Sequence, residues 1–285
     1  MQFITTLEAM RDYSRRARAE GKTIGFVPTM GYLHDGHMSL ARAARKECDT
    51  VVMSIFVNPT QFVPGEDFDR YPRDMERDRR LAEEAGVDVV FAPSVDAMYP
   101  DGYATHIETT GALTQTLCGS SRPGHFKGVT TVVAKLFDIT CPDKSYFGQK
   151  DAQQAVVVKR MTRDLNMPVE IRVMPIVRET DGLAMSSRNT YLSGDQRRQA
   201  QALSRSLKKS EDMIAGGEFS AGRIKEGIVK ILQEEKDIKI DYVAVVDADR
   251  LTELETVRDN TLIAIAAFVG QTRLIDNTVI EKVGL

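Results

Sequence analysis

The continuous apolar run at residues 51–57, Val-Val-Met-Ser-Ile-Phe-Val, constrains the fold of this 285-residue chain more than any other stretch. Its β-branched residues favour a strand, and the lack of regular alternation with polar residues indicates a strand that is buried on both faces. Such strands belong to parallel sheets with helices on each side. A second apolar run at residues 23–27 comes one helical segment earlier, so the chain is expected to begin as an α/β fold.

Strand and helix patterns alternate up to residue 174. Strands are predicted at 23–27, 51–57, 87–92, 144–147 and 169–174, and a first helix begins near Leu7 and ends at Gly21. A charged helix is predicted from Pro72 to Gly86, with its Asp and Arg residues on a solvated face. One further strand is expected near residues 105–109. This alternation predicts a Rossmann-like, doubly wound, mostly parallel sheet.

The pattern changes after residue 175. Two amphipathic helices are predicted at about 194–215 and 220–236, followed by strand-like runs at 241–247, 262–269 and 273–280. Short connections between these three strands favour antiparallel pairing. We therefore predict two domains: a Rossmann-like α/β domain at 1–175 and a smaller C-terminal α+β domain at 176–285.

Charge and composition narrow the class of function. The chain has 41 acidic residues against 38 Lys and Arg, a formal net charge of −3, whereas nucleic-acid binders usually show a basic excess. The longest apolar run, residues 262–269, is too short to span a bilayer. Three scattered cysteines indicate a reducing compartment rather than a disulfide framework. We expect a cytoplasmic protein that acts on small molecules, without nucleic-acid or membrane partners.

Residues 28–37, Pro-Thr-Met-Gly-Tyr-Leu-His-Asp-Gly-His, connect the first of these strands to a helix. His34 and His37 fall on one face of a helical turn, beside the N–H groups and partial positive charge of the helix N-terminus. Gly31 and Gly36 lack a Cβ, which leaves room for a nucleotide near the backbone. The stretch predicts a phosphate site. A metal site and a pair of ordinary surface histidines are the alternatives, but zinc needs three or four ligands and the chain has only four histidines and no Cys-x-x-Cys pair.

Four later segments have similar chemistry. Gln61 follows the buried strand at 51–57, where a ligand crevice opens in α/β sheets. Gly148 and Lys150 follow the strand at 144–147, so the lysine lies where a helix N-terminus would hold phosphate. The loop at 121–128 carries Arg122 and suits an anion, and residues 185–189, Met-Ser-Ser-Arg-Asn, form a donor-rich loop.

Taken in chain order, these segments resemble those of the pantothenate synthetase (pantoate–β-alanine ligase) family, and the resemblance covers essentially the whole chain. The segments are 28–37, 55–62, 121–126 with 148–154, and 185–189. The first and last also resemble the His-x-Gly-His and Lys-Met-Ser-Lys-Ser elements of the wider nucleotidyltransferase superfamily. The second element here is Met-Ser-Ser-Arg, without the usual first lysine. Gln149 stands where Glu is expected in many relatives, and we assign it no charged role.

The resemblance implies a two-step ligation. ATP and pantoate form pantoyl adenylate and pyrophosphate, and the amine of β-alanine then attacks the acyl carbon to give pantothenate and AMP. Catalysis of the first step is expected to be alignment plus charge stabilisation. Mg²⁺ is expected mostly on ATP oxygens, with no protein ligand assigned.

The resemblance also gives each domain a role. The domain at 1–175 is expected to bind nucleotide and pantoate, and the family suggests a homodimer formed through it. The loop at 185–188 is expected to make the domain at 176–285 a lid over the reactive adenylate.

Individual residues take their roles from the same resemblance. His37 is the expected proton-donating catalytic residue, with His34 beside it. Gln61 and Gln154 are the expected pantoate contacts. Tyr71 and Arg122 are expected either to support the residues that contact the substrates or to contact phosphate. The residues expected to bind the phosphates are Lys150, Ser186, Ser187 and Arg188. The residues assigned to ATP are Met30, Gly31, Tyr32, Leu33, His34, Asp35, Gly36, His37, Gly148, Gln149, Lys150, Asp151, Val177, Met185, Ser186, Ser187 and Arg188.

Three other functions remain as alternatives. A cytidylyl- or adenylyltransferase would release a stable nucleotidyl product and need no amine. A tRNA-synthetase-like protein would need a basic surface, which the composition does not supply. A non-catalytic ATP-binding module would leave the Met-Ser-Ser-Arg loop and the two glutamines without purpose. Product analysis with ATP, pantoate and β-alanine separates them.

Overall fold

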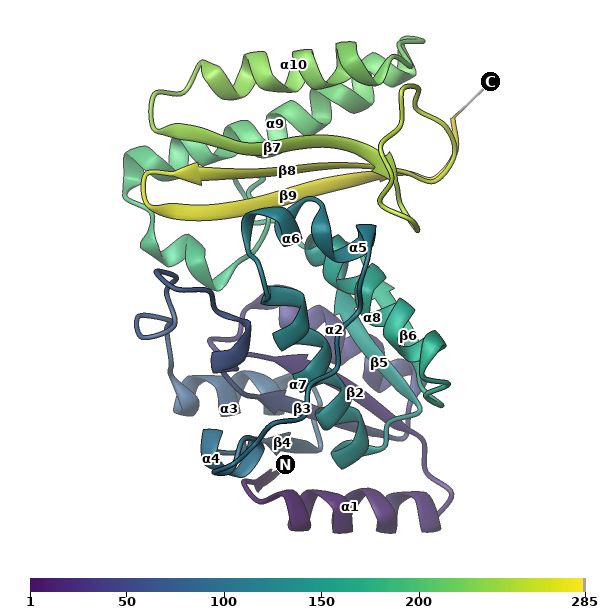
Figure 1. Cartoon of the computed structure of the whole chain (residues 1–285). Coiled ribbons are helices and arrows are strands. Elements are labelled where there is room, and N and C mark those ends of the chain that lie inside the picture. The colour runs from purple at the N-terminus through teal and green to yellow at the C-terminus, as the bar shows by residue number, and fades with distance from the viewer. Residues whose placement is uncertain (284–285) are drawn as a thin grey trace. The chain divides into compact units, whose positions relative to one another are not determined.

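The computed structural model describes residues 1–283, and the chain divides into two compact units (Figure 1). The first unit comprises Met1–Thr109, Arg122–Gln149 and Val157–Pro175, and the second comprises Thr110–Ser121, Lys150–Val156 and the chain from Ile176 onward. One boundary between the units thus falls directly after residue 175. The segments at 110–121 and 150–156 group with the C-terminal residues, which no local pattern in the sequence indicated.

The first unit contains a six-stranded sheet in the order β1-β4-β3-β2-β5-β6, and every adjacent pair of strands is parallel. This confirms the predicted Rossmann-like sheet. Strand β1 was not predicted because three residues carry too little pattern. The strands are β1 (Gln2–Ile4), β2 (Ile24–Thr29), β3 (Thr50–Ile55), β4 (Val89–Phe91), β5 (Lys144–Gly148) and β6 (Glu170–Met174).

Helices cover both faces of this sheet. Phe26 and Val27 are adjacent on β2, so their side chains point to opposite faces. Val27 packs in one hydrophobic cluster with Met38 of α2, whereas Phe26 meets Phe137 of α7 at 6.2 Å between ring centroids. The helices of this unit, with one shared by both units, are α1 (Leu7–Ala19), α2 (Asp35–Glu47), α3 (Met75–Glu84), α4 (Val95–Met98), α7 (His125–Thr140) and the shared α8 (Ala152–Asp164).

Two predictions about the connection before α7 are wrong. Residues 105–109 form no strand, because side chains of α7 take the backbone groups of Ile107: its N–H donates to Thr131 Oγ1 at 3.0 Å, and its carbonyl accepts from Thr130 Oγ1 at 2.6 Å. The loop predicted at 121–128 is helical from His125 onward. Gly128 lies so close to the chain that a Cβ there would be 2.3 Å from the Thr60 carbonyl oxygen.

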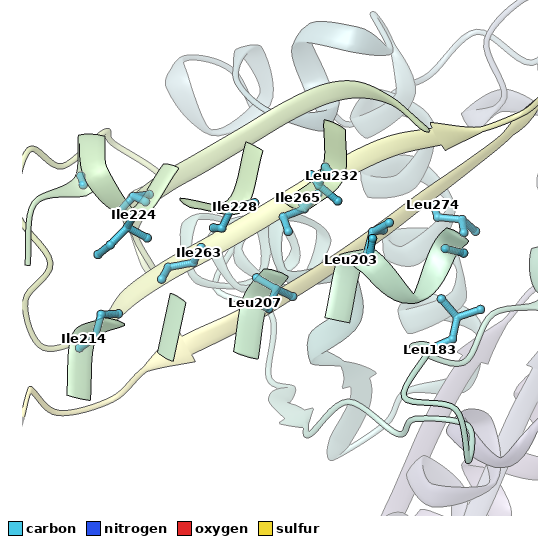
Figure 2. Packing of buried hydrophobic residues seen from close by; sticks show 14 of the residues in the cluster. Leu183, Leu203, Leu207, Ile214, Ile224, Ile228, Leu232, Ile263, Ile265 and Leu274 are labelled. Atoms are coloured by element: carbon cyan, nitrogen blue, oxygen red, sulfur yellow. The ribbon is translucent and has the colours of Figure 1, made fainter. Parts of the chain in front are cut away.

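The second unit contains the three-stranded sheet β7-β8-β9, and both pairs are antiparallel as predicted. Figure 2 shows its core, where Ile263 and Ile265 of β8 pack with Leu203 and Leu207 of one helix and Ile228 of the other. The apolar spacing of the two long helices therefore buries one face of the sheet. The elements are α9 (Gly194–Ala215), α10 (Ala221–Gln233), β7 (Ile238–Asp247), β8 (Thr261–Val269) and β9 (Thr272–Ile280).

Side-chain hydrogen bonds attach residues 110–121 to the second unit. This segment forms the short helices α5 (Ala112–Gln115) and α6 (Cys118–Ser121). The Gln153 amide donates to the carbonyls of Leu113 and Thr116 at 2.9 and 2.8 Å and accepts from the Cys118 N–H at 2.9 Å. Because both ends of the Gln153 amide are used in this way, it anchors the segment rather than a ligand.

Candidate active site

The two histidines of the first motif sit at the start of α2. His34 is the residue before the helix, His37 lies in its first turn, and their ring centroids are 4.0 Å apart. The backbone N–H of His34 donates to His37 Nδ1 at 3.3 Å. Since Nδ1 is the acceptor, the neutral imidazole carries its proton on Nε2. The second nitrogen of His37 is thus set up as a donor.

The turn before the helix is held by side chains rather than by backbone pairing. The Gly31 N–H donates to Thr29 Oγ1 at 3.1 Å. The next two N–H groups, of Tyr32 and Leu33, donate to the two carboxylate oxygens of Asp78 at 2.7 Å each. Together with His34, four consecutive backbone donors have partners within the chain. The N–H groups of the loop before α2 are therefore engaged within the protein and are not directed at a ligand.

The same turn has an unusual backbone conformation. Gly31 has φ +83° and Tyr32 has φ +48°, so two successive residues are left-handed. A Cβ at Gly31 would lie 2.9 Å from Ile55 Cγ2 and 3.0 Å from Asp78 Oδ2. Glycine is therefore needed at position 31 for internal packing and conformation. We expected the missing Cβ to make room for a nucleotide. The structure instead shows that a Cβ here would meet Ile55 and Asp78.

Asp78 lies on α3, in the helix whose charges were all assigned to solvent. That prediction is wrong for Asp78, which is only 1% exposed. Burial raises the pKa of its carboxyl, while the two backbone donors from Leu33 and Tyr32 and the nearby Arg77 act in the opposite direction. A helical signal for this burial existed, because Asp78 lies four and seven residues before the buried Ala82 and Ala85.

Gln61 ends the short 3-10 helix Pro59–Gln61 that follows β3. Its amide oxygen accepts from Asn58 Nδ2 at 3.0 Å, and its amide nitrogen contacts Met30 Sδ at 3.2 Å. Asn58 is 1% exposed and also accepts from the Tyr99 hydroxyl at 2.7 Å. Burial raises the pKa of Tyr99 to about 12, so the phenol remains a donor at neutral pH. The structure thus brings Gln61 and Met30 together, and Asn58 is a supporting residue that sequence reasoning missed.

Arg122 is engaged by the protein itself. Its guanidinium binds both oxygens of Glu66, at 2.5 and 2.8 Å, and donates to His125 Nε2 at 2.8 Å. The other nitrogen of His125, Nδ1, donates to the Gln61 carbonyl at 2.7 Å. Burial raises the pKa of Glu66, but the hydrogen bond and charge of Arg122 outweigh it and leave that pKa below its usual value. This network fixes the Gln61 backbone and neutralises the charge that was expected to meet phosphate.

Tyr71 follows Gln61 by ten residues and serves the packing of this segment. It is 5% exposed, and its ring lies edge-on to Phe62 at 6.0 Å between centroids. The structure therefore places Tyr71 next to the residue that follows Gln61.

In the second unit, β9 supports two of the predicted nucleotide segments. Asn277 Nδ2 donates to the Lys150 carbonyl at 3.0 Å. The neighbouring Asp276, which is 2% exposed, accepts from both terminal nitrogens of Arg178 at 2.7 and 3.0 Å. Val177, next to Arg178, accepts at its carbonyl from the Met185 N–H at 3.0 Å. The polar pair Asp-Asn within this strand was the signal that sequence reasoning overlooked.

The Met-Ser-Ser-Arg loop has its own supports. Ser186 caps the 3-10 helix Ser187–Tyr191, with its hydroxyl accepting from the Arg188 N–H at 3.2 Å. Asn189 is 6% exposed and donates to Glu179 at 2.6 Å and to the Ala184 carbonyl at 3.1 Å. These bonds fix the backbone, while Ser186 and Arg188 themselves are half-buried.

The residues assigned to ATP and pantoate belong to both units. The first unit carries Met30, the histidine turn, Gln61, Gly148 and Gln149. The second carries the remaining ones: Lys150, Asp151, Gln154, Val177, Met185, Ser186, Ser187 and Arg188. Gln154 is half-buried on α8, beside the fully engaged Gln153.

No group of three or more His, Cys, Asp or Glu within residues 1–283 is arranged to hold a metal ion. In the same part of the chain, no helix combines the length and apolar character needed to cross a bilayer.

Comparisons of sequence and of structure with known proteins agree on the family to which this chain is similar. A model of the pantoate-beta-alanine ligase family matches residues 2–279. Relatives named pantothenate synthetase from Moorella thermoacetica and Acetivibrio thermocellus are 59% and 57% identical over 281 residues, which is 99% of this chain and 99% and 100% of theirs. The solved pantothenate synthetase of Thermus thermophilus has a TM-score of 0.94 at 46% identity, over 98% of this chain and 99% of that one. The pantoate-beta-alanine ligase of Francisella tularensis, complexed with beta-gamma ATP and beta-alanine, has a TM-score of 0.82 at 34% identity, over 99% and 98%.

Proposed function

The chain belongs to the pantoate–β-alanine ligase family and catalyses the ATP-dependent ligation of pantoate and β-alanine, and we propose that it does so through a pantoyl adenylate held by the residues described above. The observation that carries this proposal is the His37 ring, whose Nδ1 is fixed by the His34 N–H at the N-terminus of α2. A donor with a fixed proton position beside a helix N-terminus suits a phosphate on which charge develops.

In the first step, the pantoate carboxylate attacks the α-phosphorus of ATP. A P–O bond forms to the carboxylate, and the bond to the pyrophosphate oxygen breaks. His37 Nε2–H donates a hydrogen bond to an α-phosphate oxygen as its negative charge grows. Lys150 and Arg188, with the hydroxyls of Ser186 and Ser187, hold the phosphates and stabilise the leaving pyrophosphate. His34 stacks beside His37 and helps to fix its ring.

In the second step, the neutral amine of β-alanine attacks the acyl carbon of the adenylate. The C–N bond forms, the acyl C–O bond breaks, and AMP leaves with the electron pair of that bond, while the proton lost by the amine is released to solvent. Gln61 contacts pantoate and borders the amine site, and its side chain is fixed by Asn58 and Met30. Gln154 is the second pantoate contact. An amide both donates and accepts, which suits a substrate with two hydroxyls and a carboxylate.

Mg²⁺ would reach the site on ATP. The described residues offer no ready cage of three or more carboxylate, imidazole or thiolate ligands. We propose that the ion is held mainly by triphosphate oxygens and water, the usual arrangement for Mg²⁺. Its contribution when bound is to neutralise charge on the leaving pyrophosphate.

The loop at 185–188 is proposed to close over bound nucleotide and keep water from the adenylate, which makes the unit that carries it a lid. We further propose a cytoplasmic homodimer. Sedimentation equilibrium of the purified chain would give a mass twice that of the monomer, and a monomeric mass at working concentration would contradict it.

Product analysis tests the function directly. With ATP, Mg²⁺, pantoate and β-alanine, the expected products are pantothenate, AMP and pyrophosphate in equal amounts. Formation of ADP and phosphate, or of a stable nucleotidyl product that does not need β-alanine, would contradict the proposal.

A further inference from the structure

We propose that Asp78 is a positioning residue for the first chemical step, which it serves by fixing the turn that carries His37; this rests on the proposed role of His37. Asp78 contributes a carboxylate from α3, a different element from the turn and from α2. Nothing in the reaction requires its charge to touch a substrate. Its effect is therefore indirect, through the backbone of the turn.

The geometry of the contact is that of a clamp. Each carboxylate oxygen accepts one N–H, Oδ2 from Tyr32 and Oδ1 from Leu33, both at 2.7 Å. The carboxylate is nearly fully buried, so water cannot replace it as an acceptor. Loss of the clamp would leave one buried backbone donor, at Leu33, and one partly buried donor, at Tyr32, without partners.

The clamped backbone needs such support. Tyr32 has φ +48°, a left-handed conformation that costs a non-glycine residue energy and persists only where the surroundings impose it. Leu33, which is fully buried, is directly followed by His34. The N–H of His34 in turn fixes Nδ1 of His37. A continuous chain of contacts thus leads from Asp78 to the imidazole of His37.

The test is a double-mutant cycle on the ATP–pyrophosphate exchange rate at saturating pantoate and ATP. Asp78→Asn keeps the shape but places an NH₂ group against one backbone donor, and it should lower the rate by about 10- to 100-fold with KM for ATP changed by less than about 3-fold. If Asp78 acts through His37, the double variant Asp78→Asn/His37→Ala should be as slow as His37→Ala alone, within about 2-fold.

Asp74→Ala is the matched control. Asp74 caps the same helix by accepting the Arg77 N–H at 3.0 Å, without contacting the turn. It should lower the melting temperature while leaving the exchange rate of folded enzyme unchanged. Should Asp78→Asn fail to fold, Gly31→Ala disturbs the turn from the other side, because its Cβ would meet Ile55 and Asp78; it should show the same non-additivity with His37→Ala.

The outcomes are distinct. The positioning role is overturned if the double variant shows in full the losses of exchange rate of both single variants. It is also overturned if Asp78→Asn and Gly31→Ala both exchange at the wild-type rate. Neither result affects the proposed function. A wild-type rate for His37→Ala removes the catalytic assignment of that histidine, and with it this inference. A loss in the single variant that vanishes in the His37→Ala background supports the role.

Discussion

At the scale of single residues, the chemistry depends on which atoms the backbone leaves available. The spacing of His34 and His37 predicted that the two imidazoles share a helical face, and their rings do lie 4.0 Å apart. Phosphate binding at this turn stays a prediction. The sequence could not show that Nδ1 of His37 is taken by a backbone N–H, since this depends on the dihedral angles of the turn. Asp78 was missed for a similar reason: one carboxylate in a run of charges reveals its burial only through its spacing from Ala82 and Ala85.

His37→Ala should lower kcat by about 10²- to 10³-fold, because one preorganised donor to the developing charge is lost. ATP affinity should fall much less, since the phosphates keep their other contacts. Steady-state kinetics and calorimetric titration with ATP check this. His106→Ala, which removes an exposed imidazole with no assigned role, is the control and should match wild type. ATP binding abolished with kcat near wild type would make His37 a binding residue instead.

At the scale of elements, the regular helices and strands followed from apolar periodicity, and the irregular supports did not. Residues 105–109 resembled a strand by composition, yet their backbone groups are taken by threonines of α7. The loop at 121–128 resembled an anion site because it holds Arg122. Its partner Glu66 is 56 residues away in sequence, so the neutralising pair could not be predicted from either segment alone.

Glu66→Gln should lower the free energy of unfolding by about 1.5–3 kcal/mol at pH 7, because the charge-assisted hydrogen bonds between Arg122 and Glu66 are lost. Both side chains are mostly buried, so solvent screens this ion pair only weakly. Arg122 keeps the pKa of Glu66 below its ordinary value of 4.5, so the carboxylate stabilises the fold above pH 4.5. This contribution is lost as the pH falls through the lowered pKa. Denaturant unfolding of both proteins should therefore give a difference that shrinks below pH 4.5. Glu108→Gln, in a more exposed pair at 4.0 Å, is the control and should show almost no difference.

Arg188→Ala should slow adenylate formation and raise the ratio of AMP released to pantothenate formed, since an incompletely closed loop admits water to the adenylate. Both products are measured in one reaction at limiting β-alanine, alongside a melting curve. Arg198→Ala removes the same charge from an exposed position on α9 and should leave the ratio unchanged. An unchanged ratio with a lowered melting temperature for Arg188→Ala would mark the loop as a static junction.

At the scale of the whole molecule, alternation of apolar strands with helices predicted the parallel sheet, and the change of pattern near residue 175 predicted the antiparallel one. The membership of residues 110–121 and 150–156 in the second unit could not be predicted. It depends on long-range contacts such as those of Gln153 with the carbonyls of Leu113 and Thr116, which no local pattern encodes. The residues that we predict to bind ATP are distributed over both units.

The exchange of labelled pyrophosphate into ATP tests the two-step account most directly. If pantoyl adenylate forms first, exchange will require pantoate and Mg²⁺ and will proceed without β-alanine, because the first step is reversible before the amine arrives. Each component is omitted in turn, and exchange is compared with pantothenate formation in the same preparation. Exchange that needs pantoate but not β-alanine is the predicted result. Exchange that appears only when β-alanine is present would contradict the adenylate pathway.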